Sequence, residues 1–130
     1  MKTTSLGLSQ ELRTIGYPQK GEMWWIEFKK DKFDLYDGHT FPARWSGRSC
    51  VSPTADELME VLPPDIKIPN LGNRLCQLHI IKEGDSYTVG YWQENIPGAT
   101  SANDTTLCDA LAKMVIFLKN SDLLNWDKNE

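Results

Sequence analysis

The sequence predicts an α+β fold in which helices pack on an antiparallel sheet of about four to five strands. Two segments, 23–36 and 75–93, alternate like strands and break at short polar turns typical of β-hairpins. Three other segments carry apolar residues at helical spacing, bounded by capping residues. Because short connections favour antiparallel pairing, we expect the order α-ββ-α-ββ-α.

The chain has 130 residues, enough for one domain with a single core. We expect residues 1–130 to form that domain, with a short flexible tail at about 125–130. Apolar residues make up 40% of the chain, which excludes the disordered and collagen-like classes. The formal net charge is −4, so we expect no nucleic-acid partner.

The first helix is expected at Ser5–Ile15. Leu8, Leu12 and Ile15 lie at positions i, i+4 and i+7, which places them on one face of a helix, and Gly16 ends the helix. Met23–Lys30 then alternates between two faces, as a half-buried strand does.

Phe33–Tyr36 is expected to return as the partner of this strand. Phe41–Trp45 forms a third short strand or crosses the surface.

The second helix has two alternative starts. Ser52 can cap it, with a proline at the first helical position, or Thr54 and Glu57 can form a capping box. The helix ends before Pro63, and its apolar stripe consists of Ala55, Leu58, Met59 and Leu62.

The second hairpin is the clearest β signal in the chain. Its strands are expected at Leu75–Lys82 and Tyr87–Gln93, joined by a Gly-containing turn. The segments on either side, Pro64–Asn73 and Glu94–Asn103, are predicted to be loops.

The final helix is expected at Thr106–Lys119, capped by Asp104 or Thr105. It is apolar almost all round, with Asp109 and Lys113 forming a narrow polar strip. Such a helix lies at the centre of the core or covers a partner surface. A homodimer through this helix would use the face formed by Cys108, Ala112 and Val115.

The three cysteines, Cys50, Cys76 and Cys108, match no zinc or redox spacing and are predicted to be free thiols in a reducing compartment. The N-terminus lacks the apolar run of a signal peptide. The longest strongly apolar stretch, 110–118, is too short to cross a bilayer. We therefore expect a cytoplasmic protein with no membrane partner.

Catalytic and metal-binding patterns are weak. Neither His39 nor His79 has a Cys or His neighbour at metal-ligand spacing, and the glycines are scattered singly rather than gathered in a phosphate loop. An acidic cluster at Asp31, Asp34 and Asp37 lacks the every-second-residue spacing of a calcium loop. We expect no catalytic residues, metal or cofactor.

Five tryptophans are the main functional lead. Neighbouring residues of a strand point to opposite faces, so Trp24 and Trp25 are both buried only if both faces of the sheet are covered. We expect Trp24 and Trp92 in the core and Trp126 in the tail. Trp25 and Trp45 remain as candidate partner-binding residues, since exposed aromatics are enriched in binding hot spots.

Several segments carry a resemblance to a known group of proteins. LSQELRTIGYPQ followed by MWW, then SPTADELMEVLP, YTVGYW and TTLCDALAKMVIFLKN, resemble in order small uncharacterised proteins of bacteriophages, prophages and Bacteroides-type gut bacteria. The resemblance covers Leu8 to Leu124. It implies a phage- or prophage-associated origin and an α+β domain, and it supplies no catalytic residues.

The C-terminal half is also similar to HicB-type antitoxins. Tyr87–Trp92, Ile96-Pro97-Gly98 and Asp104–Met114 follow the outline of their partial RNase-H-like domain: strands, a Pro-Gly and a Thr-capped helix.

Three functional hypotheses remain open. The first is a small non-enzymatic binding or accessory protein of phage or prophage type. The second is an antitoxin-like or inhibitor module that binds a protein partner through its ββα surface. The third is a carbohydrate-binding module with Trp25 or Trp45 as the platform for a sugar ring.

Overall fold

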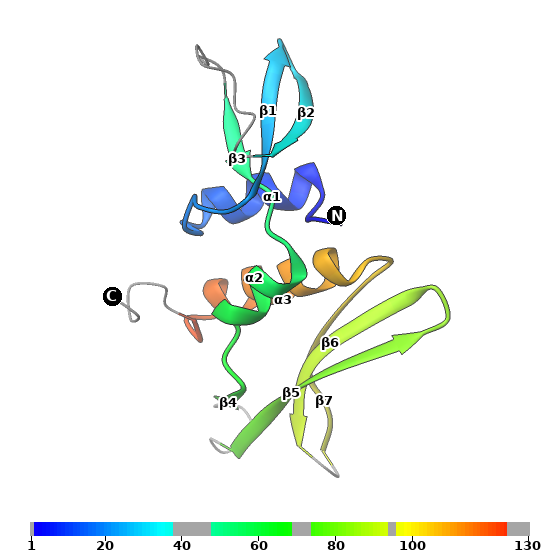
Figure 1. Cartoon of the computed structure of the whole chain (residues 1–130). Helices are drawn as coiled ribbons and strands as arrows, with labels where there is room; N and C mark the ends of the chain where they lie inside the picture. The colour runs from blue at the N-terminus through cyan, green and yellow to red at the C-terminus, as the bar shows by residue number, and fades with distance from the viewer. Residues whose placement is uncertain (1, 38–47, 69–73, 94–95, 125–130) are drawn as a thin grey trace.

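The computed structural model describes residues 2–37, 48–68, 74–93 and 96–124. Within these ranges the chain forms three helices and seven strands (Figure 1). In chain order these are α1 (Leu6–Thr14), β1 (Met23–Lys29), β2 (Lys32–Asp37), β3 (Ser49–Val51), α2 (Ala55–Val61), β4 (Asp65–Ile68), β5 (Arg74–Glu83), β6 (Ser86–Gln93), β7 (Ile96–Asp104) and α3 (Leu107–Asn120).

The α+β class is confirmed, but the predicted order and the single sheet are wrong. The strands form two antiparallel sheets, one with the order β2-β1-β3 and one with the order β4-β5-β6-β7. β4 and β7 lie in the two segments that were expected to be loops. The third strand is β3, whereas the segment Phe41–Trp45 lies outside the described residues.

β4 and β7 are strands for the same physical reason: each forms backbone hydrogen bonds with a neighbouring strand, although its own sequence does not predict a strand. β4 has only four residues, and it pairs with 74–77 of β5. β7 contains Pro97 and Gly98, both poor strand formers, yet it lies at the edge of its sheet, where a missing N–H is tolerated.

The helices lie between the two sheets (Figure 1). The three-stranded sheet and α1 are at the top of this view, α2 and α3 are in the middle, and the four-stranded sheet is at the bottom. One continuous core joins these layers, from Leu12 of α1 and Val51 of β3 to Leu111 of α3 and Tyr91 of β6.

α3 is central to this core, as its almost wholly apolar sequence predicts. Seven of its residues are buried, among them Cys108, Ala112 and Val115, whose side chains are covered within the chain itself. Phe117 is its exposed large apolar residue, at 46% exposure. A dimer through this helix stays a prediction.

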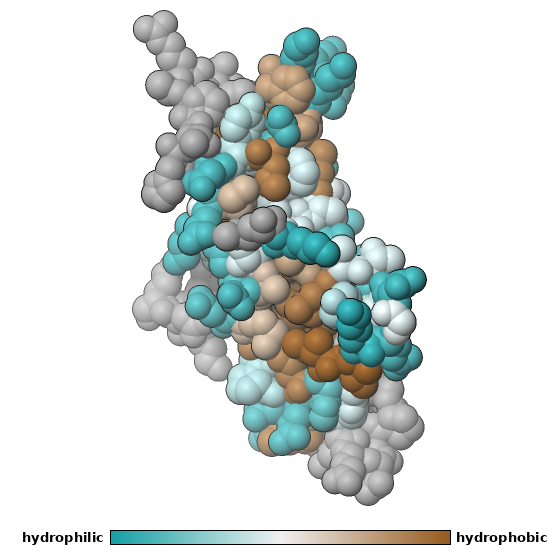
Figure 2. All heavy atoms as spheres, turned by 45° about the vertical axis from the view of Figure 1, so that its right-hand side comes forward, coloured by the Kyte–Doolittle hydropathy of each residue, from teal (hydrophilic) through white to brown (hydrophobic). Residues whose placement is uncertain are grey.

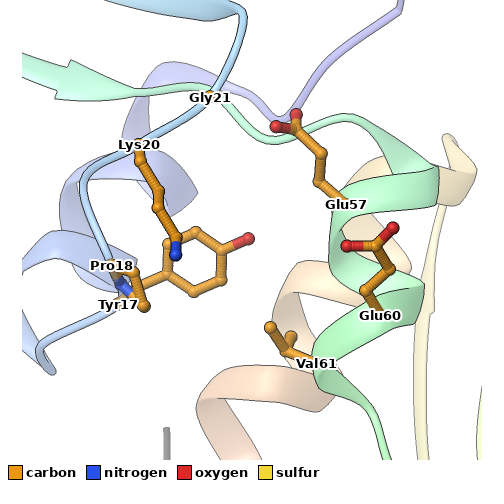
Figure 3. A pocket seen from close by; sticks show the side chains of 7 residues that line it. All are labelled: Tyr17, Pro18, Lys20, Gly21, Glu57, Glu60 and Val61. Atoms are coloured by element: carbon orange, nitrogen blue, oxygen red, sulfur yellow. The ribbon is translucent and has the colours of Figure 1, made fainter. Parts of the chain in front are cut away.

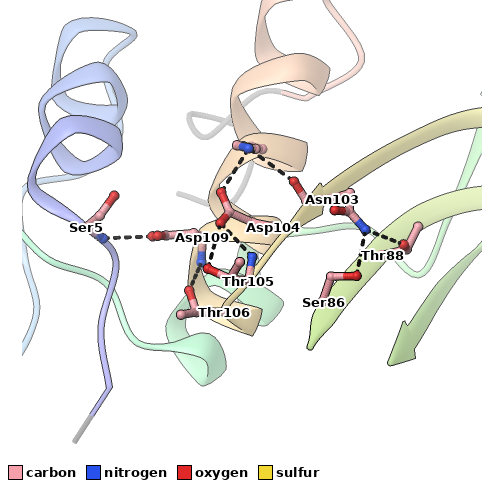
Figure 4. Close-up of polar contacts among 9 residues, drawn as sticks. Ser5, Ser86, Thr88, Asn103, Asp104, Thr105, Thr106 and Asp109 are labelled. Carbon is pink, nitrogen blue, oxygen red and sulfur yellow. Dashed lines mark hydrogen bonds and ion pairs between the residues drawn. The ribbon is translucent and has the colours of Figure 1, made fainter. Parts of the chain in front are cut away.

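The cap of α3 is Thr106, not Asp104 or Thr105 (Figure 4). The Thr106 hydroxyl accepts from the Asp109 N–H at 3.2 Å, and the Asp109 carboxylate accepts from the Ser5 N–H at 2.8 Å. Asp104 instead forms a 2.8 Å ion pair with Lys113, which lowers the pKa of the Asp104 carboxyl. The start of α3 therefore also anchors the N-terminal segment.

α2 begins with the capping box formed by Thr54 and Glu57, so this alternative is confirmed and the Ser52 cap is not. Leu58 and Leu62 of its apolar stripe are buried, whereas Met59 is 38% exposed.

α1 buries Leu12 fully, with Leu8 and Ile15 packed against the same core. This is the face that the sequence predicts.

The three cysteines are free and buried, as predicted. Burial raises the pKa of the Cys50 and Cys108 thiols, which lowers the fraction of reactive thiolate at neutral pH. In the described ranges, no helix is both long and apolar enough to span a membrane.

Candidate functional site

Trp25 is half-buried, and the other predicted binding residue, Trp45, lies outside the described residues. The indole N–H of Trp25 donates to the Thr4 carbonyl oxygen at 3.0 Å. The same carbonyl accepts from the Ser52 hydroxyl at 2.7 Å. Trp25 thus holds the N-terminal segment against the three-stranded sheet, and its polar atom is already engaged.

Trp92 lies outside the core, which corrects the prediction for this residue. β6 turns Val89 and Tyr91 toward the helices, where both are fully buried. Gly90 and Trp92 alternate with them and therefore face the other way. Trp24, in contrast, packs against the core as predicted.

We call this other side of the four-stranded sheet the outer face. The register of β4, β5, β6 and β7 defines its members, because residues directly opposite each other share a face. They are Asp65, Lys67, Leu75, Gln77, His79, Ile81, Glu83, Ser86, Thr88, Gly90, Trp92, Ser101 and Asn103.

A stacked aromatic pair lies on the outer face. The rings of His79 and Trp92 are nearly parallel, at an interplanar angle of 6°, with centroids 4.6 Å apart. His79 is directly opposite Gly90 in the ladder, and a Cβ on Gly90 would come within 2.5 Å of the Trp92 ring. The missing side chain at Gly90 therefore makes room for the indole.

Exposed aliphatic residues flank this pair on the same strand. Leu75 is 45% exposed and Ile81 is 38% exposed, and both share the outer face with His79. Apolar surface gathers in the lower half of the molecule, beside the hairpin of β5 and β6 (Figure 2). Clustered exposed apolar side chains of this kind are typical of interaction surfaces.

The outer face also carries polar side chains. The Asn103 amide donates to the Thr88 hydroxyl at 2.9 Å and to the Ser86 hydroxyl at 3.4 Å (Figure 4). These bonds tie β7 to β6 near the hairpin turn. Ile81 lies directly opposite Thr88 of this polar group, and the exposed Gln77 lies opposite Trp92, so polar side chains border the apolar ones on the outer face.

The sequence contains a signal for the position of Trp92. Trp92 shares one face of the strand with Gly90 and Thr88, which lie two and four residues before it, whereas Val89 and Tyr91 lie on the other face. The apolar set belongs in the core, so Trp92 belongs to the solvent side.

A cavity of about 350 Å³ lies between α2 and the segment after α1 (Figure 3). Lys20 is on one side, and Glu57 and Glu60 of α2 line the other. Burial, with the two carboxylates adding to it, raises the pKa of Tyr17 to about 12. The Tyr17 hydroxyl therefore stays protonated at neutral pH and is a poor base or nucleophile.

A charged cluster joins the first hairpin to the start of β3. The Arg48 guanidinium contacts the Glu27 carboxylate at 2.6 Å and the Asp31 carboxylate at 2.9 Å, and it lies 5.4 Å from the centre of the Phe33 ring. Hydrogen bonds from Arg48 and from the Asp31 N–H lower the pKa of Glu27 to about 2. The charges are thus paired with one another, which is a structural role.

Replacing Arg48 with alanine is expected to raise the pKa of Glu27 from about 2 toward its ordinary 4.5. The pairing stabilises the fold above the unfolded-state pKa, and this stabilisation is lost as the pH falls toward 2. An NMR titration of the Glu27 carboxyl carbon measures the change. Lys32→Ala in the same hairpin should leave the pKa of Glu27 nearly unchanged, and equal titration in wild type and Arg48→Ala would contradict the assignment.

The candidate catalytic and metal-ligating residues are not brought together. Cys76 faces the core and His79 the outer face of the same strand. Asp31 pairs with Arg48, and His39 lies outside the described residues. Within the part of the chain that the structure describes, no three His, Cys, Asp or Glu side chains gather as a metal site.

Comparison with protein-family models, with curated proteins and with solved structures finds no match.

Proposed function

We propose that this chain is a small non-enzymatic binding protein that engages a protein partner through the apolar and aromatic residues of the outer face. The observation that carries the proposal is the row of Leu75, His79 and Ile81 on one strand, with Trp92 stacked beside His79. An aromatic anchor flanked by exposed aliphatic side chains is the usual composition of a protein-binding hot spot.

The chemistry of this surface favours a protein over a sugar. A carbohydrate site combines an open aromatic ring with polar groups that bond the sugar hydroxyls. Here one side of the Trp92 ring is covered by His79. The exposed Gln77 lies directly opposite Trp92, and the aliphatic Leu75 and Ile81 are the exposed large apolar residues of β5 on the same face. Aliphatic side chains cannot satisfy hydroxyl groups, but they match the apolar core of a protein interface.

The resemblance of the sequence to phage and prophage proteins supports an accessory role in a mobile element. A second candidate, an inhibitor of antitoxin type, is favoured by one further observation. β5, β6 and β7 form an antiparallel meander followed directly by the Thr106-capped α3, the outline that HicB-type domains share. Both functions need a protein partner on the same surface.

The test is affinity capture from the source organism, followed by a binding measurement with the purified partner. Leu75→Ser and Ile81→Ser should each weaken binding about tenfold or more, because each removes an anchor at the proposed contact. Phe28→Ser is the matched control, since Phe28 is 48% exposed but lies on the other sheet.

Thermal melting of each variant shows that the fold is retained. A partner held equally by all three variants, or no enriched partner at all, would contradict the proposal. For the inhibitor function, the captured partner should be an enzyme whose activity falls when wild-type protein is added.

A further inference from the structure

Part of β5 has a neighbouring strand on one side only. β4 pairs with residues 74–77 of β5, whereas β6 pairs with residues 77–83. From 79 to 83, the edge of β5 that faces away from β6 therefore has no strand beside it among the described residues. We call this segment, His79–Glu83, the open edge.

Two prolines explain where the open edge begins. The Leu78 N–H donates to the Pro64 carbonyl at 2.9 Å, which is the last bond on this side of β5. Pro64 has no N–H to bond back to Leu78. The next possible donor, the Leu62 N–H, bonds to the Leu58 carbonyl of α2. The Pro63 carbonyl accepts from the Tyr91 hydroxyl at 2.6 Å. Because Tyr91 is on the core side, the chain leaves the sheet edge at Pro63.

The direction in which the Leu78 N–H points shows which way the backbone groups of the following β5 residues point. Along a strand paired antiparallel, backbone N–H and C=O groups point alternately toward one neighbour and the other. Leu78 points away from β6, so Ile80 and Lys82 do as well. Within the described ranges, no backbone hydrogen bond joins the outward groups of these two residues to another segment.

The open edge is also apolar and accessible. Ile80 is 40% exposed on the core side of β5, and Ile81 is 38% exposed on the outer face. Figure 1 shows the hairpin of β5 and β6 extending away from the helices, and apolar surface lies beside it in Figure 2. An exposed apolar strand edge is a template for pairing with another strand.

We propose that a second copy of this chain pairs with the open edge, so that two β5 strands join antiparallel across a two-fold axis at Ile81. The two four-stranded sheets then form one continuous sheet. This proposal goes beyond the binding function above, because it rests on the backbone edge of β5. The two outer faces then adjoin at Ile81, so Leu75→Ser, which lies outside the open edge, tests partner binding without changing the dimer contact.

The register follows from the residues. Hydrogen bonds between the two copies form only where outward-pointing residues lie opposite each other. Ile80 can lie opposite Ile80, Ile80 opposite Lys82, or Lys82 opposite Lys82, and these pairings place the two-fold axis at Ile80, Ile81 or Lys82. An axis at Lys82 sets two ammonium groups directly opposite, which is unfavourable. An axis at Ile80 sets Lys82 opposite Leu78, where Pro64 already occupies the edge. The axis at Ile81 remains.

This register satisfies the outward backbone groups and pairs compatible side chains. Ile80 of each chain lies opposite Lys82 of the other, giving four backbone hydrogen bonds. The aliphatic stem of Lys82 covers Ile80, the two Ile81 side chains meet at the axis, and His79 comes opposite Glu83. Imidazole and carboxylate are complementary donor and acceptor groups.

The first test measures the mass of the full chain by sedimentation velocity over a range of concentrations. Wild type should form a dimer. Lys82→Pro should be at least tenfold weaker in self-association, because proline removes the outward N–H but no bond to β6. Lys82→Ala keeps the N–H and should remain a dimer. A wild-type chain that stays monomeric at its highest soluble concentration overturns the proposal.

The second test reads the register. Residues 81 of the two chains form a non-hydrogen-bonded pair, whose Cα atoms lie about 4.5 Å apart, within the range that a disulfide bridges. Ile81→Cys should therefore cross-link under mild oxidation, while Glu83→Cys should not. The three native thiols are buried and give little background. The proposal is also overturned if Lys82→Pro still dimerises and Ile81→Cys does not cross-link. That result would indicate a different dimer, for example one through α3.

Discussion

Gly90→Ala is expected to destabilise the fold by about 2–3 kcal/mol, at the upper end of the range for overpacking a tight site. The new Cβ would lie 2.5 Å from the Trp92 ring and 2.7 Å from the Thr100 carbonyl oxygen. The indole can rotate away, but the carbonyl belongs to β7, so the backbone of two paired strands has to shift. Urea unfolding followed by circular dichroism measures the loss.

Gly7→Ala is the matched control for this change. Gly7 lies in α1, and a Cβ there would meet nothing within 4 Å. Alanine should stabilise this helix by about 0.5–1 kcal/mol, so the two variants should differ in sign.

Trp92→Ala, combined with Gly90→Ala, should recover only part of the loss, because the contact with Thr100 remains. Wild-type stability of Gly90→Ala would show that the indole does not rest at this position.

Leu111→Ala is expected to cost about 3 kcal/mol, within the range for a leucine truncated in a core. Leu111 is fully buried in α3, the helix that contacts α1, α2, β6 and β7. A cavity at this point is lined by several elements, which cannot all move in to fill it. Equilibrium unfolding of the full chain gives the value.

Phe117→Ala on the same helix tests whether burial is the cause. The side chain is large but 46% exposed, so its truncation should cost less than about 1 kcal/mol. Equal losses for the two variants would contradict the assignment of α3 as the centre of the core.

The features predicted correctly from the sequence depend on residues close to one another in the chain. The capping box forms between Thr54 and Glu57, which are three residues apart in the sequence. The buried face of α1 consists of apolar residues spaced three and four residues from Leu12. The last cap was expected one or two residues too early, because Asp104, Thr105 and Thr106 are all capable caps. The hydrogen bond from the Asp109 N–H to the Thr106 hydroxyl identifies the cap, while Asp104 pairs with Lys113 instead.

The features missed depend on residues far apart in the chain. β7 has the composition of a loop, and the ladder with β6 makes it a strand. β4 is a strand because 74–77 of β5 lies beside it.

For the candidate site, the tryptophan content led to Trp25 and Trp45; Trp25 is half-buried and Trp45 lies outside the described residues, so both stay predictions. The Trp25 indole donates to the carbonyl of Thr4, which is 21 residues away in the sequence, and the half-buried Trp92 stacks on His79 on the outer face. Neither contact follows from the residues on either side of these tryptophans.

The sequence by itself determined the α+β class, the three helices with their apolar faces, the two hairpins and the free cysteines, because each follows from short-range spacing and composition. The tertiary structure was needed to show that the hairpins belong to different sheets and that Trp92 stacks on His79. It also shows that, among the described residues, 79–83 of β5 pair with a strand on one side only. The physical reason is that strand pairing satisfies backbone hydrogen bonds between distant segments, and no local pattern states which segments meet.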